Sequence, residues 1–542
     1  MLLSPEKKYY VYRLGLSLAS GASLASAFAP ANTPLFALAA LILIFYIVGV
    51  TEKVSHAVLW GMAFGFGWFV TGISWVYYSM YHYGYMPLEW TYVTTCVFSL
   101  ALALFPTVAF ALVVKFVSNP IVRMALALPA AFTLLEWVRG WLLTGFPWLN
   151  PAYAIVDWPL AGLAPFIGSF GVLLGLVWIA GLIGAIWALK GKWIYVAACG
   201  ITIFSVLLLS MAGKQIVWSE PSGEMTVRLV QPNLEPRLLQ QSMSERFDEM
   251  YFYLDNVKVE KTSVDAVILP ESAYPLAWQQ FPNDQKERLL QWVKSEKKSL
   301  LFNAFWLSDG QYSNAAIALD EKGDLSLYQK HHLVPFGEFV PWGFRWFIDA
   351  MRIPMTDLQP GNESQLAMNF AGHSVAVNLC YENLFGSEWI RAWDQASPEL
   401  LINLSNLKWF GPVKAASQHL QISQMRALET ARPLLSVTNS GETAYVDAHG
   451  VVVKRLATDI DATMDVTVTT MNGETAYVDA HGVVVKRLAT DIDATMDVTV
   501  TTMKGDATPY VKWGDWPAVI LAFLMLIAAF ICTFAEKRLQ KG

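Results

Sequence analysis

The chain has 542 residues, of which 55% are hydrophobic and only 15% are charged, and 22 of them are tryptophan. Its mean hydropathy of +0.38 is above that of a soluble globular protein and indicates an integral membrane protein. The net charge is only −6 and no basic block is interleaved with aromatic residues, which argues against a nucleic-acid partner.

Eight apolar runs are long enough to cross the hydrocarbon core of a bilayer, which takes about 20 residues. They are Tyr12–Phe28, Pro34–Val50, His56–Tyr78, Trp90–Phe116, Val122–Val138, Leu160–Leu189, Trp193–Met211 and Trp516–Phe534. No plausible cleavage site follows the first run, and a second apolar run comes directly after it. We therefore expect a retained helix and not a removed signal peptide.

The positions of lysine and arginine predict the orientation of these helices, because cytoplasmic loops are enriched in both residues. With eight spans, one side receives Lys7, Lys8, Lys53, Lys115, Arg123, Lys190, Lys192, Lys537, Arg538 and Lys541. Both termini are then cytoplasmic, and the long stretch after the seventh span lies outside. We expect a seven-helix bundle over residues 1–213, an outer domain over 214–515, and a last helix with a cytoplasmic tail over 516–542.

The outer stretch has a different pattern, in which short β-branched runs alternate with helical segments. The runs are MTVRLVQPN, DAVILPES, SLLFNAFW, SVAVNLCYE, ELLINLSN and PLLSVTNSG. Strands that alternate with helices predict an α/β domain. Each run ends in polar residues, and strand ends with their following loops carry the functional sites of such domains.

A tandem repeat lies near the end of the outer stretch. Ser440–Met471 and Asn472–Met503 are two consecutive copies that differ only at their first position. Each copy contains two strand-like segments, VVVKRLA and MDVTVTT. Two near-identical copies are typical of a recent duplication or of a sequence-assembly artefact, whereas solenoid repeats diverge. A domain that needs one hairpin here must loop out the other.

One cysteine stands apart from the rest. Three of the four lie in apolar runs, and only Cys380 lies in the outer stretch, which therefore forms no internal disulfide. A buried cysteine is usually inert packing. Cys380, however, ends an apolar run and is followed by Tyr381 and Glu382, and an unpaired thiol outside the cell invites oxidation. This position favours a chemical role.

Other strand ends offer partners for this thiol. Glu271 follows the apolar run in ILPESAYP and could act as a general base whose pKa is raised by partial burial. Lys330, in YQKHHLVPFGEFVP, could stabilise the oxyanion that forms when a thiolate attacks an ester carbonyl. Glu338, in the same motif, could orient Lys330 or the thiol. Each of these could instead be an ordinary solvated charge.

Two adjacent histidines suggest a weaker alternative. His331 and His332 could form a Cys–His pair with Cys380, but adjacent residues of an extended segment do not both point at one site. The two histidines lack the HxH or HExxH spacing of a metal site. We therefore favour the carboxylate and lysine as partners of the thiol.

The motifs ILPESAYP, KHHLVPFGEFVP, VNLCYE and NLSNLKWFG occur in this order and resemble the Glu–Lys–Cys triad of the carbon–nitrogen hydrolase superfamily. With the eight apolar runs, WVRGWLLTGFPW, QHLQISQMRALETARPLL and TPYVKWGDW, essentially the whole chain resembles the apolipoprotein N-acyltransferase family. The resemblance implies a polytopic α-helical membrane protein with eight transmembrane helices plus an α/β nitrilase-like αββα sandwich domain. It also implies the bacterial inner membrane, with the catalytic domain in the periplasm.

The resemblance further implies an acyltransferase that moves an acyl chain from a phospholipid, chiefly phosphatidylethanolamine, to the N-terminal cysteine amine of a diacylated apolipoprotein. Cys380 would be the nucleophile that carries a thioester, Glu271 the base and Lys330 the transition-state stabiliser. Further positions that match family residues near the site are Glu338, Tyr381 and Glu382. No metal or organic cofactor is implied, and we expect a monomer.

Some positions depart from the family pattern. Pro232 stands where the family usually has glycine, and Leu407 and Lys408 stand where an acidic and a small residue are common. Aromatic residues near the motifs could form membrane-dipping loops or ordinary core, namely Trp342, Phe344, Trp346, Phe347, Trp409 and Phe410.

Two other functions stay open from the sequence. The first is a membrane-tethered nitrilase-type amidase on a small soluble amide, which the membrane spans disfavour because a soluble substrate needs no such tether. The second is a non-catalytic module or a copy inactivated by the duplication.

Overall fold

The structure, a computed structural model, describes residues 5–189, 192–234, 247, 251, 264–346, 357–363, 365, 367–394, 396–411, 414–456, 462–468, 497–498, 500–505 and 507–539. The chain forms two compact units. The first comprises Met1–His82, Met86–Ile216 and Trp513–Gly542, and the second comprises Tyr83–Tyr85 and Val217–Lys512.

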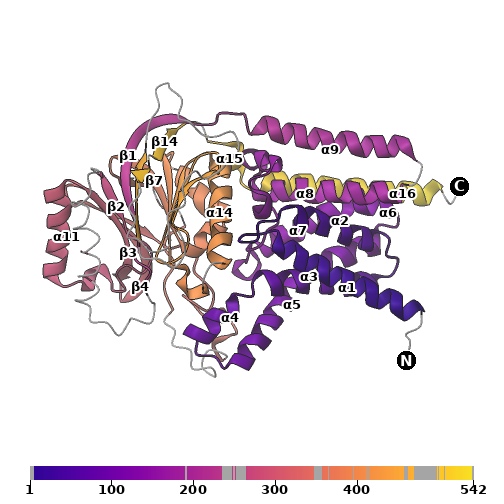
Figure 1. Ribbon diagram of the computed structural model, residues 1–542, viewed down its shortest axis with the longest axis horizontal. Coiled ribbons are helices and arrows are strands. Elements are labelled where there is room, and N and C mark those ends of the chain that lie inside the picture. The colour runs from indigo at the N-terminus through magenta and orange to yellow at the C-terminus, as the bar shows by residue number, and fades with distance from the viewer. Residues whose placement is uncertain are drawn as a thin grey trace. The chain divides into compact units, whose positions relative to one another are not determined.

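The first unit is helical (Figure 1). Its α-helices are α1 (Pro5–Ser26), α2 (Leu35–Gly49), α3 (Val54–Gly72), α4 (Val76–Tyr78), α5 (Leu88–Phe116), α6 (Pro120–Val122), α7 (Leu128–Arg139), α8 (Ala164–Ala188), α9 (Trp193–Gly213) and α16 (Trp516–Leu539). Single π- and 3₁₀-turns are η1 (Ser79–Tyr83), η2 (Arg123–Ala127), η3 (Leu142–Thr144), η4 (Tyr153–Ile155) and η5 (Pro159–Leu163). Every apolar run noted in the sequence is thus largely helical.

The predicted count of eight membrane spans is not confirmed. Among the described residues, six helical stretches are long and apolar enough to cross a membrane. They are Val54–Gly72, Leu88–Phe116, Pro120–Arg139, Pro159–Ala188, Trp193–Gly213 and Trp516–Leu539. Helix α2 is apolar but has only 15 residues, which at 1.5 Å per residue is shorter than the roughly 30 Å hydrocarbon core.

Small residues and one ion pair shape the packing of this unit. Helices α1 and α3 approach closely at two glycines. A Cβ added at Gly21 would lie 1.9 Å from the carbonyl oxygen of Phe64, and one at Gly67 would lie 2.3 Å from that of Leu18. At the end of α7, the buried Arg139 pairs with Glu136 and donates a hydrogen bond to the carbonyl of Trp148 at 2.9 Å. The sequence motif WVRGWLLTGFPW therefore fixes the chain after α7.

The second unit contains two β-sheets. The first has the order β13-β12-β1-β2-β3-β4-β5, with β14 also paired to β1, and the second has the order β11-β10-β9-β8-β7-β6. The strands of the first are β1 (Glu220–Gln231), β2 (Ala266–Ile268), β3 (Ser299–Ser308), β4 (Gln311–Leu319), β5 (Leu325–Gln329), β12 (Ala462–Val468), β13 (Asp497–Val498) and β14 (Val500–Lys504). Those of the second are β6 (Met368–Phe370), β7 (His373–Leu379), β8 (Leu400–Ser405), β9 (Leu434–Thr438), β10 (Ala444–Val446) and β11 (Val452–Arg455).

The centre of each sheet is parallel, because β1, β2 and β3 run in one direction and so do β7, β8 and β9. Parallel strands are buried on both faces, which explains why LLINLS in β8 is apolar nearly throughout and buried at every position. The carboxyl ends of neighbouring parallel strands meet at one edge of each sheet. Polar residues that follow these strands in the sequence are thereby gathered at that edge.

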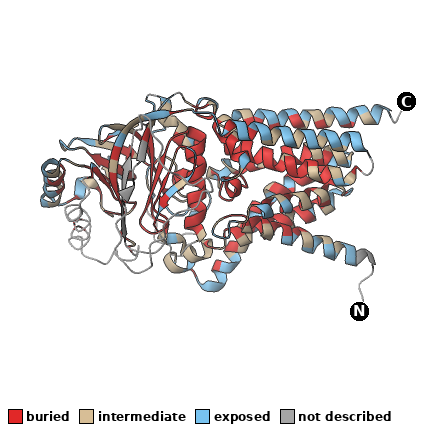
Figure 2. Ribbon diagram, turned by 45° about the horizontal axis from the view of Figure 1, so that its top comes forward, coloured by how far each residue is buried: buried red, intermediate tan, exposed pale blue. Residues whose placement is uncertain are grey.

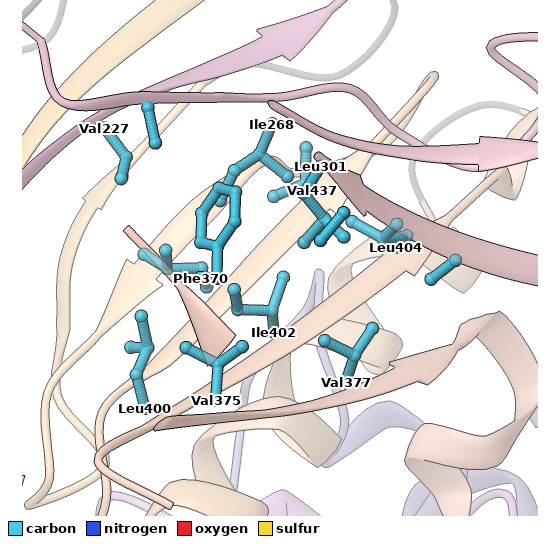
Figure 3. Close-up of a cluster of buried hydrophobic side chains, with 14 of the residues drawn as sticks. Val227, Ile268, Leu301, Phe370, Val375, Val377, Leu400, Ile402, Leu404 and Val437 are labelled. Carbon is cyan, nitrogen blue, oxygen red and sulfur yellow. The ribbon is translucent and has the colours of Figure 1, made fainter. Parts of the chain in front are cut away.

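The layers follow the order helix, sheet, sheet, helix. The two sheets pack face to face through apolar side chains such as Val227, Ile268 and Ile402 (Figure 3). Helix α11 (Asn283–Glu296) covers the outer face of the first sheet with Leu289, Trp292 and Val293. Helix α14 (Lys414–Thr430) covers the outer face of the second with Leu420 and Ala427. Figure 1 shows α11 and α14 on opposite sides of the strands, which confirms the predicted αββα sandwich.

Helix α14 is unusual for an outer layer, because every residue from Ala415 to Thr430 is buried (Figure 2). Its buried positions include His419, Arg426 and Glu429, and the last two form an ion pair at 3.0 Å. The smaller helices of this unit are α13 (Gly386–Ile390) and α15 (Pro509–Trp513), with 3₁₀-turns η8 (Trp278–Gln280), η9 (Cys380–Leu384), η10 (Arg391–Asp394) and η11 (Leu407–Phe410).

The two copies of the tandem repeat share one strand position. The first copy forms β10, β11 and β12, and β12 pairs with residues 225–231 of β1. The end of the second copy forms β13 and β14, and β14 continues the pairing over residues 220–225. Val468 and Val500 are equivalent positions of the two copies, and both pair with Met225. The VVVKRLA segment of the second copy lies outside the described residues.

Candidate active site

Cys380 lies directly after β7, at the start of η9, and its side chain is buried. Its φ angle is +49°, a left-handed conformation that costs energy for a residue with a Cβ. The carbonyl of Cys380 accepts a hydrogen bond from Nε2 of His419 at 3.3 Å. Burial lowers the pKa of His419 to about 4, so its imidazole is neutral and Nε2 carries the proton at this bond. The sharp turn therefore has a defined support on α14.

Glu271 comes shortly after β2 and is also buried. Its Oε1 accepts a hydrogen bond from Nδ2 of Asn314 at 3.0 Å, and its Oε2 accepts one from the backbone N–H of Asn406 at 2.9 Å. The thiol of Cys380 is a further hydrogen-bond partner of this carboxylate. Burial raises the pKa of Glu271, against the opposing effect of Lys330. A carboxylate with a raised pKa is a better proton acceptor.

Lys330 directly follows β5, and only 1% of its side chain is exposed. Its Nζ lies 2.9 Å from Oε1 of Glu338 and 3.8 Å from Oε1 of Glu271. Burial alone would lower the pKa of Lys330, but the carboxylates of Glu338 and Glu271 outweigh it and raise this pKa. Oε2 of Glu338 also accepts the backbone N–H of Val334 at 2.8 Å, which ties the loop after β5 to the cluster. The lysine is thus a fixed cation.

The thiol of Cys380 has the opposite character. Burial and the neighbouring Glu271 raise its pKa well above the ordinary value, against the effects of Lys330 and of a hydrogen bond from the backbone N–H of Asn406. The resting sulfur is therefore protonated, and a thiolate forms only as its proton moves to a nearby base. A carboxylate, a thiol and an ammonium group lie together here, an arrangement suited to nucleophilic attack on a carbonyl. Their catalytic roles stay a prediction.

Glu382 is fully buried, and it links the turn at Cys380 to the loop after β5. Its Oε1 accepts hydrogen bonds from the Tyr328 hydroxyl at 2.9 Å and from the backbone N–H groups of His331 and His332 at 2.7 and 3.0 Å. Its Oε2 accepts the backbone N–H of Leu379 at 2.8 Å. Burial and the charge of a neighbouring glutamate raise the pKa of Glu382 to about 7. This residue fixes the segments that carry Cys380 and Lys330.

The residues next to these positions are accounted for by packing and ion pairs. The ring of Tyr381 is buried and meets the ring of Phe385 edge to face, with centroids 5.3 Å apart. Nδ1 of His331 lies 3.1 Å from Glu388, and Nδ1 of His332 lies 3.5 Å from the same carboxylate. The two histidines therefore share Glu388 as a partner, which weakens the alternative of a Cys–His pair.

Three residues of this cluster were not singled out by the sequence. Asn314 and Asn406 bond to Glu271, and His419 supports the Cys380 turn. Asn406 lies within NLSNLKWFG, so the motif contained it without indicating its role. Asn314 gave no such signal, because it lies inside the strand QYSNAAIAL, next to other polar residues.

The positions that depart from the family pattern also lie near the site. Nζ of Lys408 donates a hydrogen bond to Oδ1 of Asn233 at 3.0 Å, and so links the ends of β8 and β1. Leu407 packs with Cys380, Ala416 and Phe410 in a small apolar cluster.

The aromatic group has mixed surroundings. Trp342 is 99% exposed, and Phe344, Trp346 and Trp409 are exposed as well. Phe410 is half-buried against the Cys380 cluster, and Phe347 lies outside the described residues. The alternative that these residues form ordinary core is therefore wrong for the four exposed ones, Trp342, Phe344, Trp346 and Trp409.

Comparison with known proteins places two family matches on the chain. Residues 20–182 match the Apolipoprotein N-acyltransferase N-terminal domain, and residues 227–509 match the Carbon-nitrogen hydrolase family. An apolipoprotein N-acyltransferase of Ralstonia nicotianae is 37% identical over 86% of this chain and 84% of its own. One of Nitrosomonas europaea is 36% identical over 97% of this chain and 99% of its own. One of Methylococcus capsulatus is 34% identical over 93% of each.

Proposed function

Since the chain belongs to the apolipoprotein N-acyltransferase family, we propose that it transfers an acyl chain from a phospholipid, chiefly phosphatidylethanolamine, to the N-terminal cysteine amine of a diacylated apolipoprotein. The single observation that carries the mechanism is the buried cluster of Cys380, Glu271 and Lys330. The apolar helices that are long enough to cross a bilayer and the family make the chain a membrane protein. We place it in the inner membrane, with the second unit in the periplasm.

In the first half-reaction, Glu271 accepts the thiol proton while the sulfur of Cys380 attacks the ester carbonyl of the phospholipid. The negative charge moves to the carbonyl oxygen, where the ammonium group of Lys330 stabilises it. The tetrahedral intermediate then collapses, and the C–O bond to the glycerol breaks. The leaving alkoxide takes the proton back from Glu271, which leaves a lysophospholipid and a thioester on Cys380.

In the second half-reaction, the amine of the lipoprotein cysteine attacks the thioester carbonyl and gives a proton to Glu271. Lys330 again stabilises the oxyanion. Collapse of this intermediate breaks the C–S bond, and the departing sulfur recovers the proton from Glu271. The products are an amide on the lipoprotein and the free thiol, so the site returns to its starting state.

The substrates of both steps carry long acyl chains, so the site must receive groups from a bilayer. The exposed aromatic side chains of the loop after Glu338 support this requirement, because tryptophan and phenylalanine partition into the membrane interface. We propose that Trp342 and Trp346 enter the lipid and guide acyl chains toward the thiol.

The decisive experiment is the intact mass of the purified protein after incubation with phosphatidylethanolamine. Wild type should gain the mass of one acyl chain, and neutral hydroxylamine should remove it, as expected of a thioester. Cys380→Ala should gain nothing, whereas the matched variant Cys532→Ala, which changes a cysteine of the first unit, should be acylated like wild type. A synthetic diacylated lipopeptide should then discharge the acyl group and become N-acylated.

The same preparation tests the alternatives. An adduct on Cys380→Ala, or none on wild type, would contradict the proposal. Release of ammonia from small amides without any lipid-derived adduct would favour a membrane-tethered amidase. A folded protein with neither activity would indicate an inactive copy.

A further inference from the structure

Asn314 occupies a special position among the groups of the site. It lies on β4, its side chain is buried, and both N–H bonds of its Nδ2 are used. One donates to Oε1 of Glu271 at 3.0 Å and the other to Oε1 of Glu338 at 2.8 Å. Lys330 reaches the same two oxygen atoms at 3.8 and 2.9 Å. The two carboxylates are thus bridged twice, by an ammonium group and by an amide.

We propose that Asn314 is a positioning residue, which holds Glu271 and Glu338 as a pair of anions around Lys330 and so keeps Glu271 free to accept the thiol proton. The inference rests on the proposed function only in taking Glu271 as the base. It extends that function to a residue outside the Glu–Lys–Cys triad.

The orientation of the Asn314 amide is fixed by its neighbours. Its Oδ1 accepts a hydrogen bond from Nδ2 of Asn303 at 2.6 Å, and the same Nδ2 donates to the carbonyl of Ala315 at 2.8 Å. Oδ1 of Asn303 in turn accepts the backbone N–H of Ser272 at 2.8 Å. A backbone N–H only donates and a carbonyl only accepts, so these two groups determine which way both amides face. The Nδ2 of Asn314 must therefore point at the carboxylates.

The charges around Glu271 show why a donor is needed there. The charged or titratable groups that act on this carboxylate are Lys330, Glu338 and Cys380. Lys330 favours the ionised form, whereas Glu338 and burial favour the protonated form. The N–H of Asn314 adds to the effect of Lys330 on the side of the ionised form. Without this donor, repulsion between the buried carboxylate of Glu271 and the partly buried one of Glu338 would favour a proton on Glu271, and a protonated Glu271 cannot act as a base.

Two substitutions at one position separate this role from simple packing. Asn314→Asp keeps the size but turns the donor into a third anion, whereas Asn314→Leu keeps the branched shape and adds no charge. For Asn314→Asp we expect the acid limb of the rate of Cys380 acylation to move up by at least one pH unit. At a pH below both midpoints, that is a tenfold or greater loss of the acylation rate, with recovery of the rate at higher pH. Asn314→Leu should shift the acid limb of the acylation rate by a smaller amount.

Asn303→Asp provides an independent test. It would replace the donor that faces Oδ1 of Asn314 with a carboxylate, so the Asn314 amide would turn and direct Oδ1 at Glu271 and Glu338. It should shift the acid limb in the same direction as Asn314→Asp. A merely structural role for Asn314 predicts lower amplitudes with an unchanged pH midpoint in all three variants, and this result would overturn the inference.

The readouts distinguish failure of this inference from failure of the proposed function. Acylation is measured on the full-length protein in detergent with phosphatidylethanolamine, and alkylation of Cys380 by iodoacetamide is followed against pH by the mass of the peptide that contains Cys380, since the chain has other free cysteines. Alkylation needs no lipid substrate. If wild type forms no lipid adduct, the proposed function fails, but a shifted alkylation profile in Asn314→Asp still supports the positioning role. If wild type is acylated and both profiles of the Asn314 variants match it, only the inference fails.

Discussion

Deletion of residues 469–500 is expected to stabilise the second unit. The first copy of the repeat ends its pairing with β1 at Val468, and the second copy resumes it at Val500, opposite the same residue, Met225. Removing residues 469–500 joins Val468 to Thr501, which is the partner of Glu224. β12 and β14 would then form one continuous strand along residues 220–231 of β1, with only the irregularity between Pro221 and Gly223.

The size of the effect follows from the length of chain that is removed. About 30 residues connect two points that pair with the same position of β1, and closing such a loop costs about (3/2)RT ln n, or roughly 3 kcal/mol. Loss of the short pairing between β13 and β12 offsets part of this gain. Each kcal/mol raises the unfolding midpoint of a domain of this size by roughly 2–4 °C, so a gain of about 2–3 kcal/mol predicts a rise of about 4–12 °C.

The assay is thermal unfolding of the purified protein in detergent, followed by tryptophan fluorescence. The matched control is deletion of residues 469–499, which leaves one extra residue between Val468 and Thr501. A one-residue slip turns the following side chains to the other face of the sheet, so this variant should unfold at a lower temperature than its partner. A midpoint below wild type after deletion of 469–500, or equal midpoints for the two deletions, would refute the reasoning.

Three further predictions concern single side chains. Burial alone would raise the pKa of Glu388, but hydrogen bonds from His331 and His332 lower this pKa to about 2. The ionised carboxylate therefore stabilises the fold by about 3 kcal/mol above about pH 4.5, and this contribution is lost as the pH falls toward 2. Glu388→Gln should flatten the unfolding midpoint over that range, and a wild-type slope would contradict this. Glu382→Gln leaves at least one of four buried donors without an acceptor, so it should lower the free energy of unfolding by about 1–3 kcal/mol in denaturant titrations at pH 8. An unchanged free energy of unfolding would count against the role of Glu382 in linking the Cys380 turn to the loop after β5. Trp342→Ser should slow thioester formation with phosphatidylethanolamine vesicles and leave the unfolding midpoint unchanged, whereas an unchanged rate would exclude a role for this loop in lipid entry.

The sequence predicted the helices well but not the number of membrane spans. Long apolar runs bury their backbone polar groups in helices, so run and helix coincide closely, as in Trp90–Phe116 and α5. The length of a helix is decided by where its ends are capped and turned, which composition does not reveal. The run Pro34–Val50 therefore gave a helix of only 15 residues, α2, because the chain leaves the helix at Val50.

The site shows a similar division. Glu271 and Cys380 were predicted because each follows an apolar, strand-like run, and Lys330 because it lies in the motif YQKHHLVPFGEFVP. Asn314 was missed because it lies inside a strand, where alternation of facing residues gives no functional signal. Its contact with Glu271 joins positions 43 residues apart, and the contact between His331 and Glu388 spans 57. Such contacts depend on strand register and on the packing of two sheets, neither of which local sequence encodes.

The protonated state of the Cys380 sulfur has a consequence for the design of covalent inhibitors. Reagents that select ionised thiols, such as maleimides and chloroacetamides, meet a weak nucleophile and a buried one, and they should label it slowly. An activated ester is a better choice, because its carbonyl would meet the neighbouring carboxylate and ammonium in the way proposed for the phospholipid donor. A long alkyl tail on such an ester would let it partition into the bilayer. Its selectivity over other cysteine enzymes would then come from this partitioning and not from the reactive group.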